Sequence, residues 1–303
     1  MSSHIFGPVL SRRFGLSLGV DLVGQGVKKC NYDCLYCELA KSKKVDKLDE
    51  YASVEEIVSE VSIALLKHPD IDFITLTANG EPTLYPNLSE LVDRLNSIKN
   101  DKKLLILSNG STIVDKSTQE ALLKIDVVKL SLDSAREESF KKIDRPIHTN
   151  PKELIEAMSN FRDVYGGTLV LETLFVKNVN DKDEDISALN DAYLRIRPDR
   201  IDLSTIDRPP AYSVDSVSEE RLREMERMLD TSLKTNIAVR KSEAKKPRAF
   251  SEDEILNSLK NRPFSAIDVD VLFDDASKKT FEDMKRKGVL KEQQIAELTF
   301  YWV

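Results

Sequence analysis

The feature that most constrains this chain is a short stretch, 29–38, that contains all three of its cysteines, Cys30, Cys34 and Cys37. They have the spacing Cys-x3-Cys-x2-Cys and follow a strand-like run at 17–23. Three thiolates this close can bind three irons of one cubane cluster, and the chain has no fourth cysteine for the last iron. An iron without a protein ligand stays open, as a catalytic metal keeps a position for its substrate. The spacing therefore predicts an iron–sulfur cluster with one open iron.

Other uses of cysteine fit this pattern less well. A disulfide framework favours an even number of cysteines in an exported chain, and we see no secretory segment. A structural zinc site takes four ligands, and His4, His68 and His148 have no ligand spacing relative to the cysteines. Free cysteines without an export signal lead us to expect a cytoplasmic location.

Composition limits the class of protein. A length of 303 residues is enough for one large α/β domain and a small module. The content of 41% hydrophobic and 32% charged residues is that of a globular protein, and no apolar run approaches the length of a membrane span. The net charge of −7 argues against nucleic-acid binding through overall charge. A local patch of Lys and Arg could still bind phosphates.

Strand-like and helix-like segments alternate after the cysteine loop. Ser53 and Glu56 have the spacing of a helix capping box before an apolar helical pattern. Buried strands are expected at 73–77, 104–107, 127–132, 168–175 and 200–206, and helices at 87–98, 116–124, 136–142, 151–165 and 182–195. This alternation indicates βαβ units with parallel strands. Six units predict an α/β fold, a partial (β/α)6 barrel, with a flat doubly wound sheet as the alternative. A helix at 218–233 and a strand at 237–240 would complete a first domain, 1–244.

The segment 245–303 is predicted to form a separate small domain. It begins with a linker-like stretch at 245–248, and Ser251 and Glu254 have capping-box spacing. Helices there, at 267–273 and at 277–287, and a hairpin from 289–290 and 295–302 resemble a winged helix. The last helix carries the cations Lys278, Lys279, Lys285, Arg286 and Lys287. In a nucleic-acid reader they would face phosphates, and the alternative is a solvated helix face with acids nearby.

Two stretches resemble a known family. Cys30, Cys34 and Cys37, with the aromatic Tyr36 before the last cysteine, resemble the motif of the radical S-adenosylmethionine (SAM) superfamily. The opening Phe6-Gly7-Pro8-Val9-x-Ser11-Arg12-Arg13-x-Gly15-x-Ser17-Leu18-Gly19-Val20 is similar to the branch grouped with wyosine tRNA-modification synthases. The resemblance covers nearly the whole chain.

This resemblance implies an enzyme with a radical SAM barrel, in which the three cysteines hold a [4Fe–4S] cluster and SAM completes it. An external ferredoxin or flavodoxin would supply a low-potential electron, and reductive cleavage of SAM would give a 5′-deoxyadenosyl radical that abstracts a hydrogen from the substrate.

The resemblance also implies roles for residues that bind SAM. Tyr36 would lie against the adenine. In the Gly80-Glu81-Pro82 motif, backbone carbonyls and a carboxylate would accept hydrogen bonds from the SAM amino group, and Pro82 would fix the turn. Ser108, Asn109, Ser131 and Asp133 stand where relatives bind the carboxylate and ribose, and Arg145 would pair with the carboxylate. The structural alternatives are an aromatic residue in the core, a strand-to-helix turn, helix caps and a surface ion pair. Glu172 and Thr173 would face the substrate or bond to the barrel wall.

The expected substrate is a base of tRNA or another RNA. The resemblance leads us to expect a second cluster and a Schiff-base lysine in wyosine synthases. No cysteine remains here for a second cluster, and nothing in the sequence favours Lys28 or Lys29. A related RNA modification is therefore expected rather than the wyosine reaction. The alternatives are a radical SAM enzyme for a small metabolite or a protein, and a non-enzymatic iron–sulfur redox or regulatory protein with a DNA-binding tail.

Overall fold

A computed structural model describes residues 4–11, 13–24, 26–237, 247–261, 263–295 and 298–303. Its main sheet has eight strands in the order of the chain, β1 to β8. The strand β1 (Ile5–Ser11) runs antiparallel to β2 (Gly15–Asp21). From β2 onward neighbouring strands are parallel: β3 (Phe73–Thr77), β4 (Lys103–Ser108), β5 (Val127–Ser131), β6 (Thr168–Phe175), β7 (Arg200–Thr205) and β8 (Thr235–Ile237). The predicted α/β fold with parallel βαβ units is confirmed.

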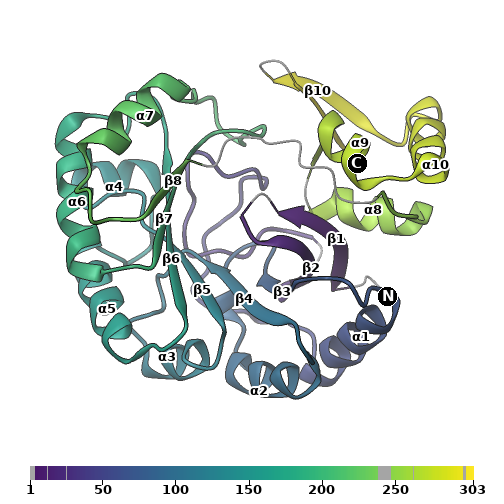
Figure 1. Cartoon of the computed structure of the whole chain (residues 1–303), viewed down its shortest axis with the longest axis horizontal. Helices are drawn as coiled ribbons and strands as arrows, with labels where there is room; N and C mark the ends of the chain where they lie inside the picture. Colours follow the sequence, from purple (N-terminus) through teal and green to yellow (C-terminus); the bar gives the residue numbers. More distant parts are fainter. Residues whose placement is uncertain (1–3, 12, 25, 238–246, 262, 296–297) are drawn as a thin grey trace.

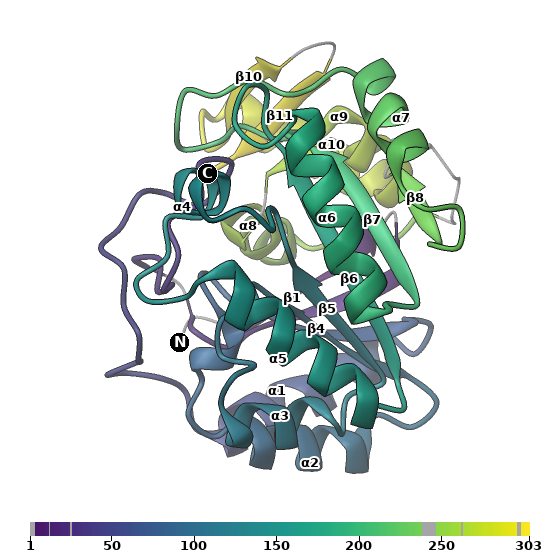
Figure 2. The ribbon, with the colours of Figure 1, turned by 90° about the vertical axis from the view of Figure 1, so that its left-hand side faces the viewer.

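The helices lie along the outer side of the curved sheet (Figure 1). They are α1 (Val54–Lys67), α2 (Leu88–Ile98), α3 (Lys116–Leu122), α4 (Glu137–Ile143), α5 (Pro151–Val164), α6 (Asp183–Ile196) and α7 (Glu219–Met228), with a 3-10 turn η1 (Pro82–Leu84) after β3. Figure 2 shows α5 and α6 across this outer side. The capping box of Ser53 and Glu56 forms as predicted. The helices thus cover one side of the sheet, and its other side carries both apolar and charged groups, such as Val170 and Glu172.

The helix α7 is shorter than the predicted 218–233. It ends at Met228, and Leu229 already has an extended backbone with φ −80° and ψ 153°. The carboxylate of Asp230 then accepts hydrogen bonds from the backbone and hydroxyl of Ser232, at 2.8 and 2.6 Å. An Asp side chain that satisfies nearby backbone donors competes with helix formation. The predicted strand 237–240 is described only at Ile237, where β8 ends; 238–240 lie outside the described residues.

The opening stretch forms a hairpin that the sequence analysis did not predict as two strands. Gly15 turns the chain with φ +71°, a conformation that glycine adopts without a steric penalty. Gly19 lies opposite Phe6, and a Cβ at this position would stand 2.2 Å from the Phe6 ring. The glycines of the opening motif therefore serve the β1–β2 hairpin. Arg12, part of that motif, lies outside the described residues.

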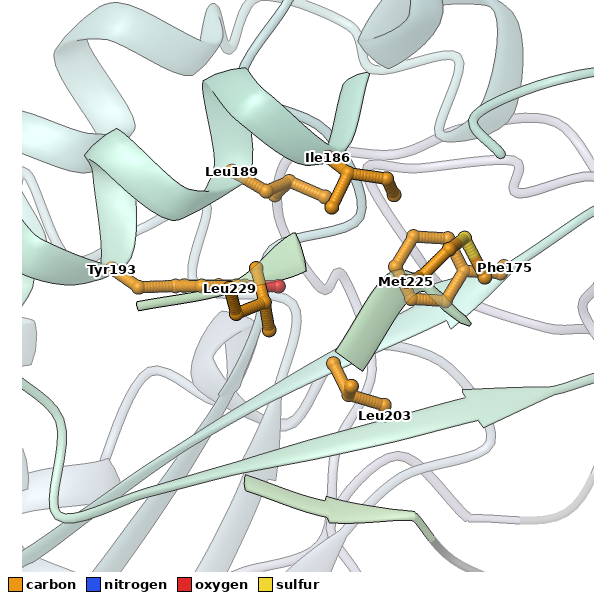
Figure 3. A pocket seen from close by; sticks show the side chains of 7 residues that line it. All are labelled: Phe175, Ile186, Leu189, Tyr193, Leu203, Met225 and Leu229. Carbon is orange, nitrogen blue, oxygen red and sulfur yellow. The ribbon is translucent and has the colours of Figure 1, made fainter. Parts of the chain in front are cut away.

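Alternation along the parallel strands separates the apolar side that packs on the helices from a side of mixed polarity. Leu18, Ile74, Ile106, Val128 and Leu171 point to the helices and join one buried cluster with them. Near the end of the sheet this layer is closely filled between α6, α7 and the strands β6 and β7 (Figure 3). The side chains there are Phe175, Ile186, Leu189, Tyr193, Leu203, Met225 and Leu229. Burial of this apolar layer is the main stabilising contribution to the sheet.

The C-terminal part has a core of its own. Its elements are α8 (Glu252–Asn261), β9 (Phe264–Ser265), α9 (Ala266–Leu272), α10 (Asp275–Arg286), β10 (Lys291–Ile295) and β11 (Leu298–Trp302), with sheet order β10-β11-β9. Phe250, Phe264, Phe273 and Phe281 form its aromatic centre. The module lies beside β1 (Figure 1). Arg248 forms an ion pair with Asp70, which lies between α1 and β3. The predicted order of helices and hairpin is present, with the short strand β9 in addition.

The hairpin strands differ from the predicted 289–290 and 295–302. Gly288 turns the chain with φ +71° and Leu290 is buried in the module's core, so the first strand begins only at Lys291. It ends at Ile295, which was predicted in the second strand. The sequence 291–294 is polar and its side chains are exposed, so no apolar pattern reveals this strand. The predicted domain boundary at 244/245 falls within 238–246, outside the described residues.

Candidate active site

The cysteine loop is held to the main sheet by its backbone. Lys29 and Gly80 form a parallel bridge, in which the Lys29 N–H donates to the Asn79 carbonyl and the Glu81 N–H donates to the Lys29 carbonyl, both at 3.0 Å. Gly80 has φ +150°, and a Cβ there would stand 1.7 Å from the Lys29 carbonyl oxygen. The Gly80 turn is thus the support on which the loop rests, and only glycine permits this approach.

The other side of the loop is paired with the segment after α4. The N–H groups of Asp33 and Leu35 donate to the carbonyls of Asp144 and Ile143, at 3.1 and 2.8 Å. The loop therefore joins the carboxyl end of β3 to the end of α4, the helix that follows β5. In α/β folds of this kind, the carboxyl ends of the strands form the ligand-binding face.

Each cysteine sulfur has a polar neighbour. The Asn109 side-chain amide donates to Cys30 Sγ at 3.7 Å, and Lys28 Nζ donates to Cys37 Sγ at 3.3 Å. Cys34 Sγ instead donates to the Asp144 carboxylate at 3.4 Å. Burial raises the pKa of the Cys30 thiol to about 12 and also raises that of Cys34. A bound metal reverses this preference, because it takes thiols in their deprotonated form.

These surroundings fit a cluster held by thiolates. The hydrogen bonds from Asn109 to Cys30 and from Lys28 to Cys37 are of the kind that stabilises the negative sulfurs of a cluster. Among the residues that the structure describes, no three His, Cys, Asp or Glu side chains gather closely enough to hold a single metal ion. The sulfurs of Cys30 and Cys37 therefore have donors that favour the thiolate form, whereas Cys34 Sγ donates to the Asp144 carboxylate.

The Gly80-Glu81-Pro82 turn uses its carboxylate internally. Glu81 is 1% exposed, and burial raises its pKa. Its Oε1 accepts hydrogen bonds from the Thr83 N–H, the Thr83 hydroxyl and the Ser108 hydroxyl, at 3.0, 2.7 and 2.7 Å. Its Oε2 accepts from the Asn109 N–H at 2.8 Å. Glu81 thereby ties the end of β3 to the end of β4, while Pro82 begins η1.

Ser108 and Asn109 belong to the same network. The Asn109 amide reaches from the end of β4 to the cysteine loop, where it donates to Asn31 Oδ1 at 2.9 Å as well as to Cys30. Ser131 ends β5 and is half-buried. The structure thus gathers Cys30, Gly80, Glu81, Ser108 and Asn109 into one connected set.

Tyr36 and Asp133, predicted to contact different parts of SAM, contact each other. The Tyr36 hydroxyl donates to Asp133 Oδ2 at 2.5 Å, and Asp133 Oδ1 accepts from the Leu174 N–H at 2.7 Å. Burial raises the pKa of Asp133 to about 6, and Asp133 and Asp144 are themselves hydrogen-bonded. Two buried carboxyls in contact favour a shared proton. The hydrogen bond to Asp133 fixes Tyr36 near the end of β5.

Arg145 is engaged by the cysteine loop. Its Nε donates to the Asp33 carbonyl at 2.6 Å, and its Nη2 is 2.9 Å from Asp33 Oδ2. Its guanidinium lies 3.9 Å from the ring centroid of Tyr212. Arg145 has φ +46°. Its partners in the structure make it a residue that shapes the loop.

A segment that the sequence analysis missed covers the cysteine loop. We call 206–216, which follows β7, the strap. Arg208 donates twice to the carboxylate of Glu38 at 2.8 Å, the Ala211 N–H donates to the Cys37 carbonyl at 2.8 Å, and the Tyr212 hydroxyl donates to Asp33 Oδ2 at 2.7 Å. No local pattern could reveal these contacts, because the partners are 170 and 179 residues apart in the pairs Arg208–Glu38 and Tyr212–Asp33.

The polar side of the sheet carries a buried charge cluster. Glu172 on β6 forms ion pairs with Lys129 on β5 and with Arg13, the latter at 2.5 Å, and Arg13 is 3.7 Å from Asp202 on β7. Burial raises the pKa of Glu172, but the charges of Arg13 and Lys129 more than offset this and lower it to about 2. Thr173 points to the other side, where it donates to the Leu132 carbonyl and contacts the Tyr193 hydroxyl.

A cavity of 610 Å3 opens at the opposite, amino-terminal ends of the strands. Its lining includes Arg13, Phe73, Lys103, Val127 and Arg200. This is the end away from the cysteine loop, so we do not include it in the candidate site.

A Glu172→Gln variant tests the charge cluster. A carboxyl whose pKa falls from 4.5 to about 2 on folding contributes about 3 kcal/mol above pH 4.5. Since the folded pKa is the lower one, this contribution is lost as the pH falls from 4.5 toward 2. The variant should be less stable than the parent by about this amount at pH 7, and the difference should shrink below pH 4.5, as measured by urea unfolding. The exposed Glu156→Gln variant is the control. An equal difference at pH 7 and pH 3.5 would contradict the assignment.

Comparison with known proteins identifies the family. Residues 26–189 match the model described as the radical SAM superfamily. The chain belongs to the radical SAM superfamily. It is 38% identical, over 98% of its length and 96% of the relative's, to the "UPF0026 protein" of Helicobacter pylori strain J99. A GTP 3′,8-cyclase of Clostridium perfringens is 29% identical over 54% of this chain and 49% of that protein. As a radical SAM enzyme, the present chain has a [4Fe–4S] cluster and SAM as its cofactors.

Solved structures share the fold. Streptococcus suis SuiB bound to the precursor peptide SuiA matches with a TM-score of 0.54 and 19% identity, over 69% of this chain and 47% of SuiB. This chain thus matches about half of SuiB's length. TYW1 with a lysine-pyruvate adduct bound matches with a TM-score of 0.51 and 19% identity, over 75% of this chain and 76% of TYW1. The curved sheet is accordingly the partial barrel of radical SAM enzymes. Among the described residues, no helix is both long and apolar enough to cross a bilayer.

Proposed function

We propose that Cys30, Cys34 and Cys37 hold the [4Fe–4S] cluster and leave one iron for SAM. The observation that carries the proposal is the cysteine loop itself, fixed on the Gly80 turn with hydrogen-bond donors at the sulfurs of Cys30 and Cys37. When bound, the cluster and SAM supply the 5′-deoxyadenosyl radical chemistry of the superfamily. Cys30, Cys34 and Cys37 are the ligands that the geometry offers.

The surrounding residues orient and enclose this site. The Tyr36–Asp133 pair fixes the aromatic ring beside the third cysteine, and the Glu81 network fixes Asn109 beside the first. The strap covers the loop through Arg208, Ala211 and Tyr212. A covered site excludes water and stray hydrogen donors.

The radical chemistry is tested by anaerobic reconstitution with iron and sulfide, followed by dithionite and SAM. The expected product is 5′-deoxyadenosine. A protein that holds a complete cluster and forms none would contradict the proposal.

We infer that the substrate is a base of tRNA or another RNA. Support comes from the C-terminal module, whose three helices and hairpin have the element order of a winged helix. On its helix α10, Lys278, Lys285 and Arg286 form ion pairs with acids of the module. Lys279 and Lys287 have no ion-pair partner among the described residues. These two cations are the ones available for phosphates.

Binding measurements test the role of these cations. The full-length double variant Lys279→Ala, Lys287→Ala should bind tRNA more weakly than the parent in a filter assay at about 100 mM salt. The steepness of the plot of log affinity against log salt should also fall by about 2, because each phosphate contact releases close to one counterion. Arg286→Ala, which removes a cation already paired with Asp283, is the matched control. No change in affinity or slope would remove the support that the module gives to an RNA substrate.

A small-molecule substrate is the second candidate. The 29% identity to a GTP 3′,8-cyclase and the ion pairs that occupy most cations of α10 favour it. Nucleoside mass spectrometry of tRNA from a deletion strain separates the two. A missing modified nucleoside supports the RNA substrate, and an unchanged profile together with unimpaired tRNA binding of the Lys variants supports the small molecule.

A further inference from the structure

Lys28 is a buried cation beside the cysteines. Its side chain is 4% exposed. It precedes Lys29, which is fixed in the bridge to Gly80. Successive side chains of extended backbone point to opposite sides, so Lys28 and Cys30 share one side, and both are buried while Lys29 is half-buried. The anchored backbone thus aims the Lys28 ammonium at the cysteines.

The described partners of Lys28 compensate its charge only in part. Its Nζ donates to Cys37 Sγ at 3.3 Å, and its ion pair with Asp33 Oδ1 is long, at 4.0 Å. The other oxygen of Asp33 is already bound by Arg145 and Tyr212. A neutral thiol is a weak acceptor, and a buried ammonium is costly without a charged or strongly polar partner. A thiolate-bound cluster would add negative charge beside this ammonium, on the side of Cys37.

We propose that Lys28 is a positioning residue that raises the reduction potential of the cluster and so eases its one-electron reduction. The inference rests on the proposed cluster site. A fixed positive charge beside Cys37 Sγ stabilises the reduced cluster, which carries one more electron, over the oxidised one, and local charge is one of the determinants of iron–sulfur potentials. Neutralising this charge should shift the reduction equilibrium at least tenfold toward the oxidised form, which is about 59 mV for a one-electron couple.

The test uses the full chain, reconstituted anaerobically, with Lys28→Met, Lys28→Gln and Lys28→Arg. Lys28→Gln keeps a donor and removes only the charge, and Lys28→Arg keeps the charge. Lys29→Met, on the opposite side of the same segment, is the matched control. Iron and sulfide content, circular dichroism and an EPR-monitored redox titration without SAM are measured for each.

We expect all variants to hold full clusters. The midpoint potential of the Met and Gln variants should fall by at least about 59 mV, which is a tenfold change in the reduction equilibrium. The midpoint potential of the Arg and Lys29→Met variants should shift little. If only the Met and Gln variants lose the cluster while they stay folded, the result also supports pairing between the charge of Lys28 and the cluster, because the Arg variant keeps that charge. An unchanged midpoint in a fully loaded Met or Gln variant would overturn the inference, as would equal cluster loss in all three Lys28 variants. A parent protein that takes up no cluster would instead refute the proposed site.

Discussion

Alanine at Cys30, Cys34 or Cys37 is expected to abolish both cluster loading and SAM cleavage. A cubane held by three protein ligands has no spare cysteine in this chain to replace a lost one. Loss of a partner that only orients a metal ligand lowers metal affinity or activity ~10–100-fold, and loss of a ligand itself should lower them more. Iron and sulfide content after anaerobic reconstitution and the yield of 5′-deoxyadenosine are the measurements.

The control for this series is Lys43→Ala, an exposed position in the connection that follows the loop. It should load the cluster and cleave SAM as the parent does. Circular dichroism separates cluster loss from unfolding. An alanine variant at any of the three positions with parental iron content and parental product yield would refute the ligand assignment.

A Gly80→Ala variant is expected to lose both stability and cluster binding. The new Cβ would stand 1.7 Å from the Lys29 carbonyl oxygen, which belongs to the backbone and cannot rotate away. The loop must then move off the turn and break the bridge between Lys29 and Gly80. Overpacking together with an unfavourable backbone conformation should cost about 2–4 kcal/mol in the free energy of unfolding. Urea unfolding and iron content after reconstitution measure the two effects.

Gly166→Ala is the matched control for this variant. A Cβ at Gly166 meets no atom within 4 Å. Its free energy of unfolding should change by less than ~0.5 kcal/mol, as is usual for surface substitutions. If Gly80→Ala matched the parent in both measurements, the Gly80 turn could not be the support of the cysteine loop.

Elements that depend on nearby residues were predictable. The strands β3 to β7 and the helices α1 to α6 lie close to the predicted segments, because apolar periodicity and capping residues act over a few positions. The cysteine loop was recognisable for the same reason. The hairpin partner β1 and the polar strand β10 were missed, since neither has a periodic apolar pattern that distinguishes it.

The candidate site was only partly predictable. The sequence placed Tyr36, Glu81, Asp133 and Arg145 near a cofactor by resemblance. The structure shows that their polar groups are bound to other protein groups: Tyr36 to Asp133, Glu81 to Thr83, Ser108 and Asn109, and Arg145 to Asp33. The strap and the burial of Lys28 had no local signal.

The alternation of strands and helices and the spacing of the cysteines can be read from short stretches of the chain, because each depends on a few neighbouring residues and their steric or chemical limits. The meeting of distant groups, such as Tyr212 with Asp33 and Gly80 with Lys29, arises only in the folded chain. Those contacts depend on how the strands are ordered and how closely the loops pack over their ends. Pairing across many residues is a property of the whole folded chain, and no short stretch encodes it.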